Sequence, residues 1–281
     1  MTPDQYCQQK AVQSGSSFYY SFLYLPLEKR RAITALYAFC REVDDVVDEC
    51  TDPAVATAKL AWWRQEVASI FSKERGINPS HPVTKALAGV AQSFNLTAER
   101  LNEIIDGMEM DLNYNRYADF ETLRRYCYHV ASVVGLCSVE IFGYRNANTL
   151  KYAQDLGLAF QLTNIIRDVG EDARRDRIYL PQDELVRFGV SEEDILQSRE
   201  SDNFRRLMEF QIERAESYYD SASAALSAED RKNQLSSIIM AAIYRTLLQE
   251  IKSDGYHVMQ HRVSLTPVRK LWLAWKTWIK G

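Results

Sequence analysis

The chain has 281 residues, of which 46% are apolar and 26% charged, and its formal net charge is −4. This composition excludes a disordered chain, and the slight excess of acid argues against nucleic acid as a partner. Average usage would give about 20 glycines and 14 prolines in such a length, whereas the chain has 11 and 7. So few helix breakers indicate a mostly helical protein.

The cysteines and the first residues bear on the cellular compartment. The five cysteines are scattered and form no C-x-x-C pair, which excludes a disulfide framework and a thiolate zinc site and fits a reducing environment. The first ten residues do not resemble a signal peptide, and no apolar run reaches the ~18 residues of a membrane span. We therefore expect a cytoplasmic protein.

Helical periodicity predominates along the chain, and no segment shows the clean alternation of a strand. The helices expected in chain order are 26–48, 53–72, 82–94, 97–113, 120–142, 147–171, 181–188, 192–197, 202–228, 232–254 and 267–279. Residues 76–82 and 173–180 are expected to be irregular, because they contain turn residues or follow a helix end. With no repeat and no linker, we predict an all-α, single-domain helical bundle over residues 1–281 around a central apolar cavity.

Two predicted helices carry acidic pairs, and the first lies in residues 41–49 (REVDDVVDE). At about 100° per residue, Asp44 and Asp48 project from the same side one turn apart, in a row with Tyr37 and Arg41, whereas Asp45 points the opposite way. The row borders an apolar stripe formed by Leu36, Cys40, Val43 and Val47. A solvated acidic face is the simpler interpretation. A second is a site that holds a cation, since the row lies at the rim of the stripe rather than opposite it.

The second acidic segment is residues 161–172 (QLTNIIRDVGED). Asp168 and Asp172 repeat the spacing of four, with Asn164 one turn earlier and Gln161 on the same side. A helix end that runs into a charged loop would also explain these residues. Two such pairs that face each other across a bundle would offer four carboxylates to a hard cation, and Mg²⁺ suits them because it takes oxygen ligands and completes its shell with phosphates.

The sequence lacks the residues that other common kinds of active site require. The four histidines form no Glu-x-x-His pair for a di-iron centre, and the chain has no G-x-S-x-G nucleophile elbow and no glycine-rich nucleotide loop. What remains is a diphosphate held by Mg²⁺ between aspartate-bearing helices, with an apolar cavity beneath for a hydrocarbon chain. NADPH is not expected as a cofactor, because no dinucleotide loop is present.

Five blocks in order resemble the squalene/phytoene synthase family, the head-to-head trans-isoprenyl diphosphate synthases. They are residues 14–19 (SGSSFY), 35–41 (ALYAFCR) leading into 44–48, 107–112 (GMEMDL), 126–131 (YCYHVA) and 164–181 (NIIRDVGEDARRDRIYLP). The resemblance covers nearly the whole chain and implies the isoprenoid synthase fold. Within the family, the first two blocks are most similar to bacterial presqualene diphosphate synthases of hopanoid biosynthesis, although phytoene synthases share most of the pattern.

The resemblance implies a reaction. Two farnesyl diphosphates would bind with their tails in apolar channels, and Mg²⁺ would help the donor to ionise. The allylic cation would be attacked by the 2,3 double bond of the second molecule, and loss of a proton would close the cyclopropane of presqualene diphosphate. The alternatives within the family are a phytoene synthase that uses two geranylgeranyl diphosphates and a squalene synthase that uses NADPH.

The resemblance also implies roles for single residues. Tyr126 is expected near the cation or the departing proton, as a catalytic residue together with Asp44, Asp48, Asp168 and Asp172. The same four aspartates and Asn164 are the expected metal ligands. Substrate contacts are expected from Ser17, Phe18, Phe22, Tyr37, Arg41, Val130, Val134, Gln161, Asn164, Arg167, Arg177, Tyr244 and Arg262. Asp111 is expected to support the site from behind, and Tyr128 to face elsewhere.

The C-terminal segment carries three tryptophans, Trp272, Trp275 and Trp278, among basic residues. Tryptophan with lysine and arginine on a short amphipathic helix is typical of a bilayer interface, so peripheral membrane contact is expected. A last helix docked on the bundle is the other interpretation.

Two functions of other classes compete with the prenyltransferase. A scaffold protein on the same fold would be expected to lose the aspartate pairs, and this chain retains both. A terpene cyclase or head-to-tail elongase also uses aspartate-rich helices, but residues 167–181 do not match those enzymes.

Overall fold

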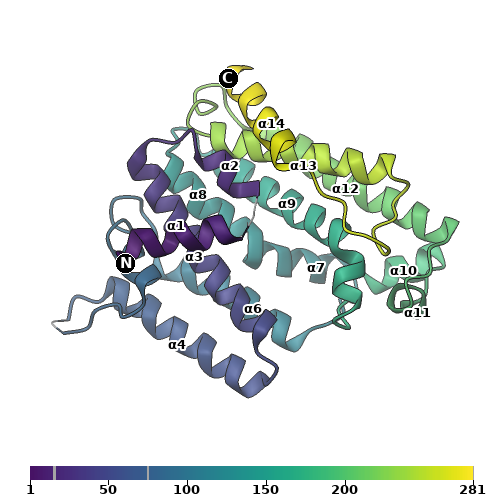
Figure 1. Cartoon of the computed structure of the whole chain (residues 1–281), viewed down its shortest axis with the longest axis horizontal. Helices are drawn as coiled ribbons and strands as arrows, with labels where there is room; N and C mark the ends of the chain where they lie inside the picture. The colour runs from purple at the N-terminus through teal and green to yellow at the C-terminus, as the bar shows by residue number, and fades with distance from the viewer. Residues whose placement is uncertain (15–16, 75, 281) are drawn as a thin grey trace.

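The computed structural model describes residues 1–14, 17–74 and 76–280, and within them it contains helices and no strand (Figure 1). The all-α prediction is confirmed. The long helices are α3 (Leu27–Glu49), α4 (Pro53–Phe71), α6 (Ala98–Asn113), α9 (Asn148–Ala173), α12 (Asp202–Ala225), α13 (Leu235–Ser253) and α14 (Pro267–Lys280). The shorter ones are α1 (Pro3–Gln13), α2 (Ser17–Phe22), α5 (Pro82–Ala88), α7 (Phe120–Cys127), α8 (Val133–Phe142), α10 (Gln182–Phe188) and α11 (Glu192–Leu196).

The N-terminal helices α1 and α2 were not expected from the sequence. The helix α1 begins at a capping box, in which the Thr2 side chain accepts from the Gln5 backbone and the Gln5 side chain accepts from the Thr2 backbone. Pro3 stands at the first helical position, where its missing N–H costs nothing. These signals are present in the sequence but are not accompanied by a strong apolar stripe. The expected helix 82–94 is also too long, since α5 stops before Gly89 and the following turns include Asn95 at φ 50°.

The expected continuous helix 120–142 is wrong in its middle, where a π-helical turn (Tyr128–Ser132) separates α7 from α8. This wider turn lies between two glycines of neighbouring helices. A Cβ on Gly107 of α6 would lie 2.6 Å from Val130 Cγ1, and a Cβ on Gly157 of α9 would lie 2.6 Å from the Ala131 carbonyl oxygen. The π turn therefore fits only because both neighbours lack a side chain.

The buried side chains form two clusters. One is built from the N-terminal helices and α8, and the other from residues between Tyr117 and Ala274. Figure 1 shows α9 in the middle of the molecule, between α3 and α12. Phe18 and Val130 are partly buried and pack against both clusters. The space between the clusters is the cavity described below.

In the described part of the chain, no helix combines the length and the apolar character that crossing a bilayer requires.

Candidate active site

A single cavity of about 870 Å³ lies between the two core clusters. The helices α3 and α9 each line it with apolar side chains in their N-terminal halves, such as Leu36 and Leu156, and with charged side chains in their C-terminal halves. The cavity therefore has an apolar end and a charged end. At the charged end, which we call the mouth, the side chains of Arg175 and Arg262 are 57% and 46% exposed, so this end is open to solvent.

The first acidic pair lies at the mouth on α3. Asp44 and Asp48 both line the cavity, in a row with Tyr37 and Arg41 as the spacing predicts. Burial raises the pKa of Asp44 to about 7, against the attraction of Arg41, and the nearby carboxylates of Asp48 and Asp111 raise it further. Arg41 donates to Asp44 Oδ2 at 2.5 Å and to Asp45 Oδ1 at 2.8 Å. The site therefore holds more negative charge than its one intrahelical cation neutralises.

Asp45 does not line the cavity. Its carboxylate pairs with Lys10 of α1 at 2.7 Å and with Arg41. Its role in the structure is to attach α1 to α3, which agrees with the expectation that it points away from the acidic row.

The second acidic pair lies on α9. Asp168 and Asp172 line the same mouth, together with Gln161 and Asn164. Burial, followed by the charge of Asp168, raises the pKa of Asp172 to about 7. The Asn164 amide nitrogen donates to Gln161 Oε1 at 3.2 Å, and its buried Oδ1 has no hydrogen-bond partner.

Arginines surround both pairs. Asp48 Oδ1 accepts a hydrogen bond from Arg177 at 3.1 Å and forms an ion pair with Arg175 at 3.0 Å, and both arginines belong to the loop after α9. No role was expected for Arg175 from the sequence, although residues 174–177 carry three arginines directly after an acidic helix end and could have indicated one. A guanidinium fork binds carboxylate and phosphate oxygens in the same way. These side chains can therefore bind a diphosphate.

Asp168 is held by two arginines, one on its own helix and one from another element. Its carboxylate accepts from Arg167 on α9, and from Arg262 Nε at 2.8 Å. Arg262 belongs to the segment between α13 and α14. Arg167 is also hydrogen-bonded to Tyr244 of α13, and that partner and Asp168 outweigh burial in raising the pKa of Arg167. The second acidic pair is thus tied to α13 and to the segment that follows it.

An aromatic cluster lies beside the first acidic pair. The hydroxyls of Tyr126 and Tyr179 each donate to Asp111 at 2.8 Å, and their rings stack with centroids 5.3 Å apart. Tyr117 packs against both rings at 5.4 and 5.7 Å. Burial raises the pKa of Asp111 to about 6, although both tyrosine hydrogen bonds and Arg177 lower it. The cluster offers aromatic faces to a cation and a carboxylate that can take up a proton.

Tyr179 belongs to the block 164–181, but no role was expected for it from the sequence. Its position depends on the loop 174–181, where Ile178 forms an isolated bridge with Arg116. No periodic pattern reports such a contact.

A second aromatic group covers the cavity from α2. The Phe18 ring lies 5.8 to 6.3 Å from the rings of Phe22, Tyr37, Phe160 and Tyr244. The Tyr37 hydroxyl donates to Ser14 Oγ at 2.8 Å. Phe160 was not expected to take part.

The predicted site residues come together at this one cavity. All of them line it except Ser17, whose side chain lies outside the described residues. Val130, Val134 and the neighbouring Gly135 line its apolar part, and Tyr128 does not line it. The roles expected for these residues stay predictions.

The donor set at the mouth fits a hard divalent cation. Carboxylates with raised pKa and the unpartnered Asn164 Oδ1 are the oxygen ligands that Mg²⁺ prefers. The described residues contain no group of three or more Asp, Glu, His or Cys side chains already placed around one metal position. A cation at the mouth would therefore take part of its shell from the phosphates of a substrate, as Mg²⁺ commonly does.

An all-α bundle with acidic pairs and arginines at the mouth of an apolar cavity is a protein of the isoprenoid synthase class. The chain matches the squalene/phytoene synthase family over residues 11–269 and belongs to that family. The resemblance seen in the sequence is confirmed. The family comprises head-to-head prenyltransferases and is generally dependent on divalent metals.

Individual relatives differ in their named products. A phytoene synthase of Arthrospira platensis is 36% identical over 278 residues, which cover 94% of this chain and 89% of the relative. The crystal structure of a dehydrosqualene synthase in complex with ligand has a TM-score of 0.86 and 28% identity, covering 99% of this chain and 96% of its own. Squalene synthase HpnC from Alicyclobacillus acidocaldarius has a TM-score of 0.79 and 26% identity, covering 90% and 94%.

Proposed function

We propose that the protein joins two prenyl diphosphates head to head in the cavity between its core clusters, and that residues 1–281 act as one domain. The observation that carries this proposal is the convergence of both acidic pairs and five arginines at the mouth of one apolar cavity. Both core clusters contribute to its lining, which favours a single folding unit.

Two geranylgeranyl diphosphates are the proposed substrates, and the product is then a phytoene precursor or phytoene itself. The Arthrospira platensis relative, at 36% identity, supports this assignment over the farnesyl diphosphate expected from the sequence. The cavity is long enough for the larger tail. Tyr152 and Asp168 both line it and lie ~24 Å apart along α9 at 1.5 Å per residue. At the ~1.2 Å per bond of an extended backbone, a geranylgeranyl tail spans ~19 Å and a farnesyl tail ~14 Å.

Condensation of two farnesyl diphosphates to presqualene diphosphate is the second candidate. The structural likeness to a dehydrosqualene synthase and to squalene synthase HpnC favours it, at 28% and 26% identity. A cavity long enough for the larger tail also admits the smaller one, so the assay below tests both.

The binding of the two diphosphates follows from the charges at the mouth. Asp44, Asp48, Asp168, Asp172 and Asn164 would hold Mg²⁺, which supplies Lewis acidity for the departure of the diphosphate. The side chains of Arg41, Arg167, Arg175, Arg177 and Arg262 would bind phosphate oxygens. Two diphosphates need this density of positive charge because each carries several negative charges.

The bond changes take place below the mouth. The C1–O bond of the donor breaks, and the diphosphate leaves with the electron pair. The resulting allylic cation faces Tyr126 and Tyr179, whose ring quadrupoles stabilise it. The 2,3 double bond of the acceptor then forms the new bond to C1. Tyr126 Oη takes the proton whose loss closes the cyclopropane, while its own proton passes to Asp111 Oδ2, to which it donates. The apolar lining excludes water, which would otherwise capture the cation.

The test is incubation of the purified protein with Mg²⁺ and either geranylgeranyl or farnesyl diphosphate, with and without NADPH, followed by mass spectrometry. We expect a C40 product from geranylgeranyl diphosphate without NADPH. A C30 product from farnesyl diphosphate alone would select the second candidate, and no coupled product from either substrate would refute the proposal.

The matched variants are Asp44→Ala and Asp168→Ala against Glu49→Ala. Glu49 is an exposed acid on α3 that does not line the cavity. We expect both aspartate variants to lose turnover by roughly a hundredfold or more with an unchanged circular dichroism spectrum, because they remove charge stabilisation at the leaving group. Glu49→Ala should retain turnover.

A further inference from the structure

The last helix, α14, turns an apolar face toward solvent. Its exposed apolar side chains, which we call the tryptophan face, are Val268, Leu271, Trp272, Trp275, Trp278 and Ile279, each between 43% and 76% exposed. At 100° per residue they span about 120° of the helix circumference. An apolar stripe of that width on a helix normally faces a core or another apolar phase.

This face is not the one that attaches α14 to the bundle. Leu273 and Ala274, on the other side of the helix, are buried at 9% and 0% exposure. Trp278, at the edge of the face, stacks on Tyr24 with ring centroids 5.5 Å apart. The helix is therefore docked on the bundle, and it also presents a second apolar surface outward.

The charge of α14 is opposite to that of the whole protein. The helix contains Arg269, Lys270, Lys276 and Lys280 and no acidic residue, while the chain as a whole has a net charge of −4. Arg269 and Lys276 lie exposed on one flank of the tryptophan face at 100° per residue, and Arg269 also pairs with Glu250 of α13 at 2.6 Å, so that Lys276 is the main lipid-facing charge. An apolar stripe flanked by basic side chains matches a bilayer surface that carries anionic lipids.

The helix α14, though not its tryptophan face, also adjoins the cavity. Val263, Ser264 and Leu265, which lead into α14, line the cavity, and so does Lys270 on its first turns. Figure 1 shows α14 beside α2 and α13, which contribute further lining residues. A lipid held at the tryptophan face would therefore lie about one helix diameter, ~10 Å, from side chains that line the cavity.

We propose that the tryptophan face binds the surface of an anionic bilayer, with the axis of α14 parallel to the membrane plane. The binding itself does not depend on the proposed function. Its purpose, the transfer of a lipophilic substrate or product, does rest on that function. Bound in this way, the protein has α14, whose first turns line the cavity, at the interface, so that a prenyl chain has a short path between bilayer and cavity. The binding itself depends on Trp272, Trp275 and the basic flank.

The test is flotation of the full chain with vesicles of phosphatidylcholine, alone or mixed with phosphatidylglycerol. We expect flotation with the anionic vesicles, weakened by high salt. Trp272→Ala/Trp275→Ala should weaken binding by about a hundredfold, about tenfold for each aromatic side chain removed. Lys276→Glu should weaken it by about fivefold or more.

Matched controls come from α4, which Figure 1 places at the opposite end of the molecule. Trp62→Ala removes a tryptophan that is 39% exposed, and Lys73→Glu reverses an exposed lysine just after that helix. Both should float as the unaltered protein does. No flotation of the unaltered protein, or equal flotation of the double tryptophan variant, would overturn the proposal. So would a concentration-dependent dimer that the double variant abolishes, because a second copy would then cover the face.

The outcome is separable from that of the proposed function. Turnover on detergent-dispersed prenyl diphosphate does not require a bilayer, and neither Trp272 nor Trp275 lines the cavity. We expect the double variant to keep that turnover. Loss of flotation with intact turnover supports the membrane contact, whereas intact flotation with no turnover in the unaltered protein would refute only the proposed reaction.

Discussion

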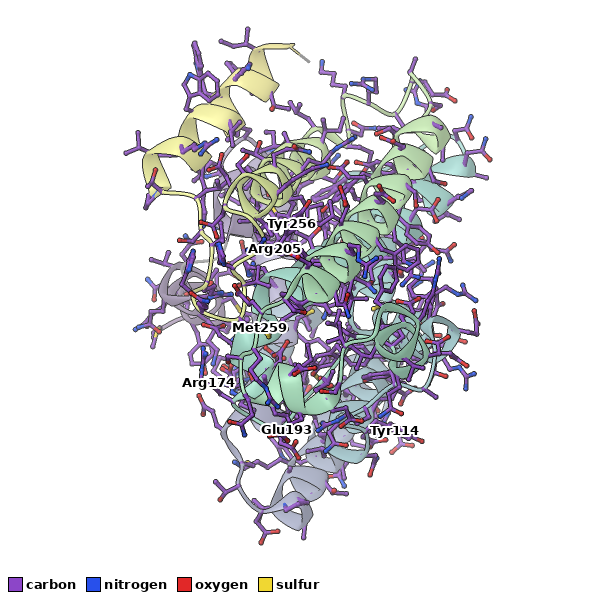
Figure 2. All side chains as sticks on the ribbon, turned by 90° about the vertical axis from the view of Figure 1, so that its right-hand side faces the viewer. Tyr114, Arg174, Glu193, Arg205, Tyr256 and Met259 are labelled. Carbon is purple, nitrogen blue, oxygen red and sulfur yellow. The ribbon has the colours of Figure 1, made fainter. Side chains whose placement is uncertain are left out.

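Replacement of Gly170 by alanine tests how the loop after α13 is held against the active site. Gly170 is buried in α9 between Asp168 and Asp172, and a Cβ there would lie 2.6 Å from the Met259 carbonyl oxygen and 2.8 Å from that of Val258. Figure 2 labels Met259 on this loop and Arg174 at the end of α9. Both close atoms belong to the backbone, so the contact cannot be relieved by a side-chain rotation.

Two opposing effects decide the sign of the change in stability. Glycine to alanine inside a helix ordinarily stabilises by about 0.5–1 kcal/mol. Overpacking against a rigid neighbour costs about 1–3 kcal/mol. We therefore expect Gly170→Ala to lower the free energy of unfolding by about 1–2 kcal/mol. Displacement of the loop also moves Arg262 away from Asp168, so turnover should fall by roughly tenfold to a hundredfold.

Urea unfolding and the product assay measure both effects. The control is Gly89→Ala, since a Cβ at Gly89 would lie 3.4 Å from the nearest heavy atom, an ordinary contact. It should lose no stability. Because Gly170 acts through Arg262, turnover in Gly170→Ala/Arg262→Ala should match that of Arg262→Ala. A Gly170→Ala protein as stable as the original, or additive losses in the double variant, would refute the reasoning.

The remaining predictions concern two carboxyl groups with shifted pKa values. Burial holds the pKa of Asp111 at about 6 against an ordinary 3.8, so the folded protein retains a proton that the unfolded chain releases, and stability falls as the pH rises through that window. Without divalent cations, Asp111→Asn should therefore be about 1–2 kcal/mol more stable than the original protein at pH 8 and not at pH 4, yet inactive. Equal stabilities at pH 8 in urea unfolding would contradict this. Glu66 is the opposite case. Burial alone would raise its pKa, but hydrogen bonds from Ser80, Thr84 and the His81 backbone lower it below the ordinary 4.5. Its contribution is present above pH ~4.5 and is lost as the pH falls through the lowered pKa. Glu66→Gln should cost about 2 kcal/mol at pH 7 and clearly less at pH 3, as measured by urea unfolding. A loss that does not depend on pH would contradict the assignment.

The sequence predicted those parts of the site that depend on one helix alone. The row of Tyr37, Arg41, Asp44 and Asp48 follows from helical geometry, because residues four apart always share a side. The bounds of α3 and α9 were predicted to within a few residues although neither has a side-chain cap at its N-terminus, because a long periodic segment is itself the strongest helix signal in a sequence.

Features that depend on distant segments could not be predicted. The π turn before α8 requires glycines on α6 and α9, and its own residues carry no sign of it. Tyr179 reaches Asp111 only because its loop is paired with Arg116. The sequence shows that Tyr179 and Asp111 are present, but only tertiary packing brings the two side chains into contact.

The position of the cavity between two separately packed clusters has a consequence for engineering. Phe18 and Val130 are partly buried side chains that touch both clusters and also line the hollow. Replacing either side chain with a smaller one widens the cavity between the two clusters and leaves the packing inside each cluster intact. Redesign for bulkier or longer substrates should therefore begin at these two positions. Substitution there costs less folding stability than truncation of side chains inside either core cluster.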